Sequence, residues 1–213
     1  MLKLSFGPLR TILCLGAHAD DIEIGCGGAL LQLLAERQEV TVHWIVFSGS
    51  TVRAEEAKQS AAQFLKDAGA RHVRILSYRD SFFPQTWGEI KEFVAHLGTT
   101  LSPDLIFTHR REDAHQDHRI LAELTWCAFR NHQILEYEIP KYEGDLGSPN
   151  VYVPLGEEIG RRKVDTLTGC FESQREKPWF SPETFSALMR LRGLECNSPT
   201  KLAEAFYGRK IVM

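Results

Sequence analysis

The stretch LCLGAHADDIEIGCGG, residues 13–28, is the one around which the rest of the chain is organised. An apolar run over residues 11–15 predicts a short buried strand, and the glycines at the end of the stretch open a helical pattern. Between them stand one histidine and two carboxylates, His18, Asp20 and Asp21. Polar groups placed directly after a buried strand indicate a candidate site.

A second apolar run ends in the same way. The stretch DLIFTHRREDAHQDH, residues 104–118, predicts a strand that leads into histidines and carboxylates, among them His115, Asp117 and His118. In parallel α/β sheets, ligands bind outside the carboxyl ends of the strands, where the strand order reverses. If the two strands are neighbours at that point, the two polar clusters form one site.

The rest of the pattern alternates strands and helices. Runs at residues 40–47, 73–76 and 133–139 predict three further strands, with helices between consecutive strands. This alternation predicts a three-layer, Rossmann-like α/β fold with a mostly parallel sheet of strand order 3-2-1-4-5. That order makes the first and fourth strands adjacent, as a shared site requires.

Glycines and prolines interrupt the pattern after residue 140, so we expect an irregular C-terminal extension that covers the sheet. Within it, residues 151–153 predict a strand, and residues 157–170 and 182–192 predict helices. A length of 213 residues with 43% hydrophobic content predicts a single domain, residues 1–213.

Composition narrows the functional class. A formal net charge of −3 gives no basic surface for nucleic acid. No apolar run approaches the roughly eighteen residues of a membrane span, and residues 1–8 are too short and too interrupted for a signal peptide. The five cysteines have no C-x-x-C spacing, which argues against a disulfide framework or a zinc ribbon and favours a reducing compartment. We therefore expect a cytoplasmic protein that acts on a small molecule.

The two clusters contain the side chains of a catalytic zinc site. Zinc favours imidazole and carboxylate ligands, and a catalytic ion keeps three protein ligands and one open position. His18, Asp21 and His118 would supply two nitrogens and one oxygen. Asp20 would be free to take a proton from a water molecule whose pKa the metal lowers to about 7. His115, one helical turn from His118, could donate a hydrogen bond to a developing oxyanion.

Each cluster alone also has a purely structural explanation, because an Asp-Asp pair after a strand is often a helix N-cap with favourable dipole charge. Two such clusters at the ends of two neighbouring strands favour a site. The glycines of residues 25–28 could suggest a phosphate loop, but they lack its motifs, and Asp20 and Asp21 would repel an anion. Close packing of the helix is their expected role.

These residues resemble the signatures of the LmbE/PIG-L family of zinc-dependent N-acetylglucosamine deacetylases. Residues 17–28, AHADDIEIGCGG, are similar to the first signature, usually written A-H-P-D-D. The H-x-x-x-D-x-H-x-D-H pattern of residues 109–118 is similar to the second signature, which ends in H-x-D-H. The resemblance covers about residues 10–130.

The resemblance implies a role for each matching position. The implied ligands of Zn²⁺, with Fe²⁺ as the alternative metal, are His18, Asp21 and His118. The implied residues of the reaction are Asp20 as general base, His115 facing the tetrahedral intermediate, and Asp117, which would orient His115. The implied substrate-binding residues are Arg53 and Asp80, although Arg53 could equally be a solvated residue of a first helical turn.

The chain departs from the family pattern at two positions. Ala19 replaces the usual proline, which should cost rigidity of the loop rather than chemistry. Phe171 stands where many relatives have a histidine, so we expect the substrate-side wall to differ. Residues 203–206, AEAF, resemble the closing motif of the family.

The resemblance implies a hydrolase that removes the acetyl group from an N-acetylated amino sugar by metal-activated water. The substrate would be an N-acetylglucosamine-type glycoside, conjugate or sugar nucleotide, and a cationic rim of Arg53, Arg110 and Arg111 would favour an anionic aglycone. One alternative is a metal-dependent phosphoesterase, which would hold two metals about 4 Å apart. The other is a non-catalytic carbohydrate- or nucleotide-binding module, although retention of both Asp20 and His115 argues against a vestigial site. The resemblance also favours a homo-oligomer.

Overall fold

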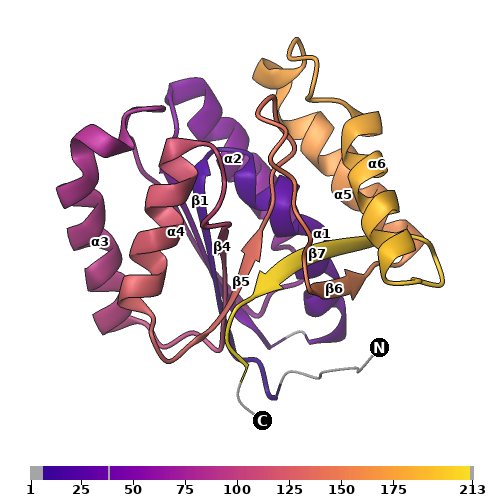
Figure 1. The fold of residues 1–213 in the computed structure, drawn as a ribbon, viewed down its shortest axis with the longest axis horizontal. Coiled ribbons are helices and arrows are strands. Elements are labelled where there is room, and N and C mark those ends of the chain that lie inside the picture. The colour runs from indigo at the N-terminus through magenta and orange to yellow at the C-terminus, as the bar shows by residue number, and fades with distance from the viewer. Residues whose placement is uncertain (1–6, 38, 212–213) are drawn as a thin grey trace.

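A computed structural model describes residues 7–37 and 39–211 of the chain. Residues 1–6, on which most of the argument about a signal peptide rests, lie outside the described residues. A seven-stranded sheet runs through the centre of the molecule, and helices cover both of its faces (Figure 1). None of the helices in the described part of the chain is long and apolar enough to span a membrane.

The strands are β1 (Thr11–His18), β2 (Thr41–Ser48), β3 (Ala70–Ile75), β4 (Leu105–His109), β5 (Gln133–Tyr137), β6 (Val151–Pro154) and β7 (Ala203–Gly208). The α-helices are α1 (Asp21–Glu36), α2 (Thr51–Phe64), α3 (Trp87–Thr100), α4 (Gln116–Ala128), α5 (Glu157–Cys170) and α6 (Pro182–Glu195). Two short 3-10 helices are η1 (Phe83–Thr86) and η2 (Glu172–Gln174).

The strand order is β3-β2-β1-β4-β5-β7-β6. The first five strands in this order are parallel, which confirms the predicted 3-2-1-4-5 arrangement, and β7 runs antiparallel to both β5 and β6. The C-terminal extension is therefore less irregular than its glycines and prolines suggested. Its strand β7, AEAFYG, was not predicted, because it contains no β-branched residue that would indicate a strand.

Alternate side chains of the central strands face two separate cores. Ile12 and Cys14 of β1 point into a core formed with α1, α2 and α5. Leu13 and Leu15 point into the opposite core, which α3 and α4 cover. Both faces of the parallel sheet are thus buried, as expected for strands that read as nearly continuous apolar runs.

The first polar cluster lies exactly where β1 turns into α1, but the two elements are longer than predicted. β1 extends three residues beyond the predicted end, and His18 still pairs with Ser48 of β2. α1 begins at Asp21 rather than near residue 28. His18 is therefore the last residue of a strand and Asp21 the first residue of a helix, so both side chains start from well-fixed backbone.

The glycines of α1 allow the close packing that the sequence indicated. A Cβ atom on Gly25 would collide with the ring of Tyr137, and one on Gly27 would lie 2.6 Å from the ring of Phe64. These contacts bring the helix against β5 and α2. The start of α1 is thereby held close to the carboxyl ends of the central strands.

Candidate active site

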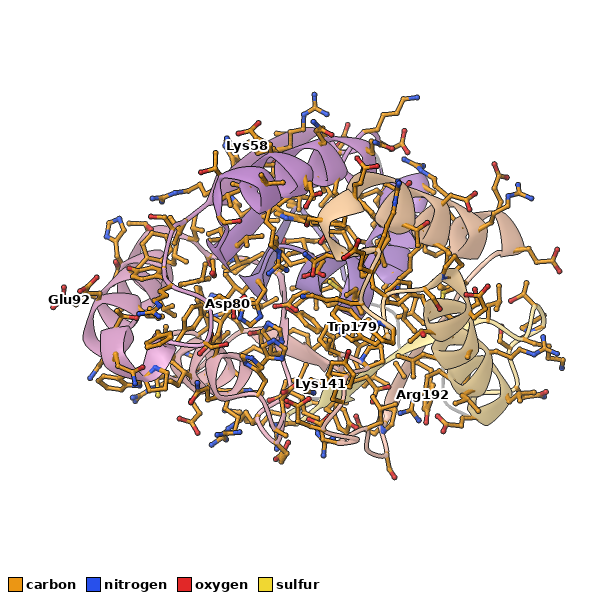
Figure 2. The ribbon with its side chains drawn as sticks, turned by 90° about the horizontal axis from the view of Figure 1, so that it is seen from above. Lys58, Asp80, Glu92, Lys141, Trp179 and Arg192 are labelled. Atoms are coloured by element: carbon orange, nitrogen blue, oxygen red, sulfur yellow. The ribbon has the colours of Figure 1, made fainter. Side chains whose placement is uncertain are left out.

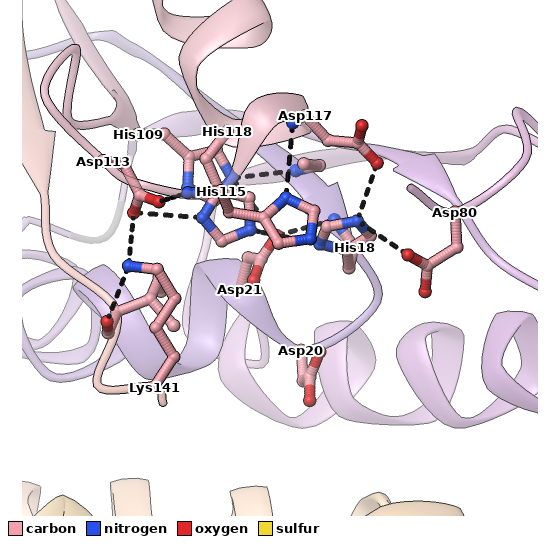
Figure 3. A network of polar contacts seen from close by, with 12 residues as sticks. His18, Asp20, Asp21, Asp80, His109, Asp113, His115, Asp117, His118 and Lys141 are labelled. Carbon is pink, nitrogen blue, oxygen red and sulfur yellow. Dashed lines mark hydrogen bonds and ion pairs between the residues drawn. The ribbon is translucent and has the colours of Figure 1, made fainter. Parts of the chain in front are cut away.

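The carboxyl ends of β1 and β4 carry the two motifs, and these strands are adjacent and parallel. The two polar clusters therefore meet in one site (Figure 3). The loop after β3 adds Asp80, and the first turn of α2 adds Arg53. Seen from this end of the sheet, Asp80, Lys141 and Trp179 lie toward the middle of the molecule, whereas Lys58 and Glu92 lie at its periphery (Figure 2).

The three predicted metal ligands present their donor atoms to one another. His18 Nδ1 lies 3.1 Å from His118 Nε2 and 3.4 Å from Asp21 Oδ2, and His118 Nε2 lies 3.5 Å from the same oxygen. The ligand atoms of a tetrahedral zinc ion, bound at about 2.0–2.1 Å, are about 3.3 Å apart. All three side chains are buried. The spacing of these donors fits one zinc ion.

The outer nitrogens of the two histidines contact carboxylates. His118 Nδ1 lies 3.1 Å from Asp113 Oδ2, and His18 Nε2 lies 3.2 Å from Asp117 Oδ2. When these outer nitrogens carry the ring protons, the inner nitrogens present two lone pairs that face each other at 3.1 Å. Such an arrangement is repulsive unless a cation, either an extra proton on His18 or a metal ion, lies between the rings, so the donor set can hold a metal in place of that proton.

The charges of the site also favour binding of a cation between His18 and His118. Burial, together with neighbouring His109, lowers the pKa of His118 to about 3, so this ring is neutral at pH 7 and its lone pair is available. Burial alone would lower the pKa of His18, but the carboxylates of Asp21 and Asp117 outweigh it and hold this pKa well above its ordinary value. Without a metal, His18 therefore binds a proton, which a metal ion would displace.

Asp20 has one carboxylate oxygen that is not used by the protein. Its Oδ1 accepts a hydrogen bond of 2.7 Å from Arg53 Nη2, whereas its buried Oδ2 has no partner. Burial raises the pKa of this carboxyl group above its ordinary value, although the charge of Arg53 opposes the shift. A carboxylate that is held by one oxygen and free at the other is suited to accept a proton.

Arg53 lies between two carboxylates rather than on an open rim. In addition to its contact with Asp20, its Nη1 lies 3.3 Å from Asp80 Oδ2. Arg110 is also engaged, because it donates to the carbonyl oxygen of Asp145 and lies over the ring of Tyr207. Arg110 is thus tied to Asp145 and Tyr207, and Arg53 faces the candidate base; a cationic rim that favours an anionic aglycone stays a prediction.

His115 caps the N-terminus of α4 and is half-buried. Its Nδ1 accepts a hydrogen bond of 3.3 Å from the backbone N–H of Asp117, so the proton of the neutral ring lies on Nε2. This tautomer can donate a hydrogen bond to an oxyanion without being charged. Burial, helped by the neighbouring charge of His18, lowers the pKa of His115.

The expected role of Asp117 requires a correction. We expected its side chain to orient His115, but its carboxylate contacts His18 Nε2 and accepts the backbone N–H groups of Ser81 and Phe83 at 2.7 and 3.1 Å. Only the backbone of Asp117 contacts His115. Asp117 therefore orients a predicted metal ligand and anchors the loop that carries Asp80.

Two residues of the second motif received no role from the sequence. His109 is fully buried, its Nε2 lies 3.1 Å from Asp21 Oδ2, and its ring stacks on His118 at 3.9 Å between centroids. Asp113 contacts His118 through Oδ2 and accepts the backbone N–H of His115 through Oδ1 at 2.8 Å. Their fixed positions in the H-x-x-x-D-x-H pattern were the available signal.

Several combinations of these side chains place their ligand atoms close together. Within residues 7–37 and 39–211, three groups could hold an ion: His18, His115 and His118; His18, Asp80, His115 and Asp117; and Asp21, His109 and His118. The first and third groups share His118. The second lies on the other side of His18.

Phe171 does not form a wall of the site. Its ring is fully buried at the end of α5 and packs edge-on against Phe180, with 6.4 Å between ring centroids. Nearby, Ser173 is held by Glu56, to which it donates both its backbone N–H and its hydroxyl. The aromatic ring of Phe171 therefore contributes to the core, and a substrate-side wall that differs from that of relatives stays a prediction.

Comparisons with known proteins give a sequence relative and similar solved structures. The chain is 27% identical over 181 residues to the uncharacterized deacetylase YaiS of Escherichia coli K12, covering 78% of this chain and 93% of YaiS. The N,N'-diacetylchitobiose deacetylase of Pyrococcus horikoshii has a similar structure, with a TM-score of 0.69 and 19% identity over 93% of this chain and 83% of that one.

The same fold also occurs in the 4-carboxy-2-hydroxymuconate hydratase GalB of Pseudomonas putida KT2440, with a TM-score of 0.71 and 16% identity over 96% of this chain and 99% of that one. Structural likeness at such identity therefore shows the fold and not the reaction. The family is shown by the sequence, since the model of the PIG-L family, GlcNAc-PI de-N-acetylase, matches residues 13–129, more than half of the chain. This match and the two motifs establish that the chain belongs to the PIG-L family and is an enzyme of the N-deacetylase type.

Proposed function

We propose that this enzyme removes the acetyl group from an N-acetylated amino sugar of the N-acetylglucosamine type, with one Zn²⁺ held by His18, Asp21 and His118. The observation that carries the proposal is the triangle of their donor atoms, 3.1, 3.4 and 3.5 Å apart, beside the unpartnered Oδ2 of Asp20. When bound, the metal polarises the amide carbonyl and makes water a better nucleophile.

Four side chains have separate roles in the proposed reaction. Asp20 takes the proton of the attacking water on its free Oδ2 and passes it to the departing amine. His115 donates its Nε2 hydrogen to the oxygen on which negative charge develops. Asp117 and Asp113 hold the rings of His18 and His118 in the orientations that point their inner nitrogens at the metal.

Asp80 is the candidate for contact with the sugar. Its side chain is 49% exposed, and it stands in the loop after β3 beside the site. Burial opposes ionisation of this carboxyl group, but its hydrogen bond with His18 and the charge of Arg53 hold its pKa below the ordinary value. A carboxylate that is ionised and partly open to solvent can accept hydrogen bonds from sugar hydroxyls.

A second candidate function, a phosphoesterase with two metals, is favoured by one observation. The group of His18, Asp80, His115 and Asp117 would be a second place for an ion. Metal content separates the two reactions: the deacetylase requires one metal per chain, and a two-metal phosphoesterase requires two.

The five free cysteines support the expected cytoplasmic location. A homo-oligomer stays a prediction.

The test of the proposed function is a screen of N-acetylated sugars, their glycosides and conjugates, and sugar nucleotides with the zinc-loaded protein. Acetate and free amine are measured together. Release of both in equal amounts supports deacetylation of an amide. Acetate without a matching amine would indicate an ester substrate, and no acetate from any of these compounds would contradict the proposal.

A further inference from the structure

A lysine from outside both motifs, Lys141, contacts the aspartate that holds His118. Lys141 lies in the connection between β5 and β6, and its Nζ is 3.0 Å from Asp113 Oδ2 and 2.7 Å from Asp145 Oδ1 (Figure 3). The lysine side chain is only 10% exposed. A lysine buried to this extent requires a carboxylate partner, and here it has two.

The first of these partners, Asp113, contacts two of the three histidines of the second motif, His115 and His118. Asp113 uses Oδ2 for Lys141 and for the Nδ1 of His118, 3.1 Å away. It uses Oδ1 for the backbone N–H of His115. The Asp113 side chain is 2% exposed, so solvent does not replace a lost partner. The orientation of this one carboxylate therefore sets the ring of His118 and the start of α4.

The second partner, Asp145, contacts the loop between β4 and α4. Asp145 accepts the backbone N–H of Ala114 at 2.6 Å, and its carbonyl oxygen accepts a hydrogen bond from Arg110 at 2.8 Å. The residues between β4 and α4 form turns without regular secondary structure. Lys141 and Asp145 therefore add two contacts to a loop that Arg119 also holds, through the carbonyl oxygens of Asp113 and Ala114.

We infer that Lys141 is a positioning residue of the metal site, which holds the Asp113 carboxylate in the orientation that fixes His118 as a ligand. Without the lysine, the carboxylates of Asp113 and Asp145 would face each other with like charges in a buried place, and Asp113 would turn away from His118. The inference rests on the proposed function for the identity of the metal ligands.

The experiment measures zinc affinity by competition with a chromophoric chelator and needs no substrate. Lys141→Met should lower the affinity by up to about 10- to 100-fold, the usual effect of losing the partner that orients a metal ligand, because it frees Asp113 to leave His118. Lys141→Arg, which keeps the cation, should retain most of the affinity. Lys58→Met is the matched control, because Lys58 makes an ion pair of 2.7 Å with Glu55 on the surface of α2. Urea unfolding of each metal-free variant checks that it is folded.

A double-mutant cycle tests the route of the effect. If Lys141 acts through Asp113, Lys141→Met should lower zinc affinity no further in a chain that already carries Asp113→Asn. Additive losses, or an unchanged affinity for Lys141→Met alone, would overturn the inference. A chain that binds zinc with these dependences but releases no acetate would contradict only the proposed function. Absence of zinc binding in the unsubstituted chain would overturn both.

Discussion

Replacement of Arg53 by methionine separates two possible roles of this residue: orientation of Asp20 and recognition of an anionic aglycone. Its Nη2 lies 2.7 Å from Asp20 Oδ1, and the Arg53 and Asp20 side chains are 17% and 4% exposed. A hydrogen bond to a charged group contributes about 1.5–3 kcal/mol. At about 1.4 kcal/mol per factor of ten, Arg53→Met should lower kcat by about 10- to 150-fold, because the candidate base loses the partner that orients it.

The assay compares kcat and KM of Arg53→Met on a neutral and an anionic N-acetylated substrate, with zinc content measured for each preparation. The loss in kcat should be similar for both substrates, since the lost contact is with Asp20 and not with the aglycone. Arg79→Met is the control, because Arg79 lies over the ring of Phe82, 3.5 Å from its centroid, in the loop that carries Asp80. A defect limited to KM for the anionic substrate would refute this reasoning and restore a role in recognition of the aglycone.

Three further substitutions test separate parts of the site and the fold. Asp20→Asn should keep about one zinc per chain and lose activity by roughly 10²-fold or more, as for loss of a general base; loss of the zinc would exchange the roles of Asp20 and Asp21. His115→Ala should lower kcat by about 10²- to 10³-fold with zinc intact, as for loss of an oxyanion donor, and loss of zinc would make His115 a ligand instead. Lys163→Met should destabilise the protein by about 3–5 kcal/mol in urea unfolding, because it leaves the buried carboxylate of Glu204 without its cation; a change below 1 kcal/mol would contradict a structural role for this pair.

Most of the fold could be predicted from local patterns in the sequence. Apolar runs alternate with helical patterns, and the right-handed crossover rule leaves few strand orders, so the adjacency of β1 and β4 could be predicted. The start of α1 was placed too late, because Asp20, Asp21 and Glu23 read as a polar loop. In the structure all three are buried in or beside the first turn of the helix, where acidic residues also interact favourably with the helix dipole.

Only the part of the site that lies within the two motifs could be predicted from the sequence. The motifs indicated the candidate ligands, but not that the Asp117 carboxylate would contact His18 or that Arg53 would face Asp20. Lys141 could not be found, because it stands in a connection without periodicity and its partner Asp113 is 28 residues away in the chain. Contacts of this kind depend on where the loops lie over the sheet, which no local pattern describes.

The strand β7 shows the same limit in the fold. Its glutamate, Glu204, accepts the backbone N–H groups of Gly28 and Ala29 in the middle of α1 and pairs with Lys163 of α5. The AEAF run resembled a family motif, but its function as an anchor of α1 depends on three elements that meet only in the folded chain.

Metal dependence of acetate release tests the central claim most directly. The protein is freed of metal with a chelator, and zinc is returned in steps while acetate and amine release from an active substrate are followed. We predict no activity in the metal-free protein, full recovery at one zinc per chain, and neither tight zinc binding nor recovery in His118→Ala. Undiminished activity of the metal-free protein, or recovery that requires two metals per chain, would contradict a single zinc site formed by His18, Asp21 and His118.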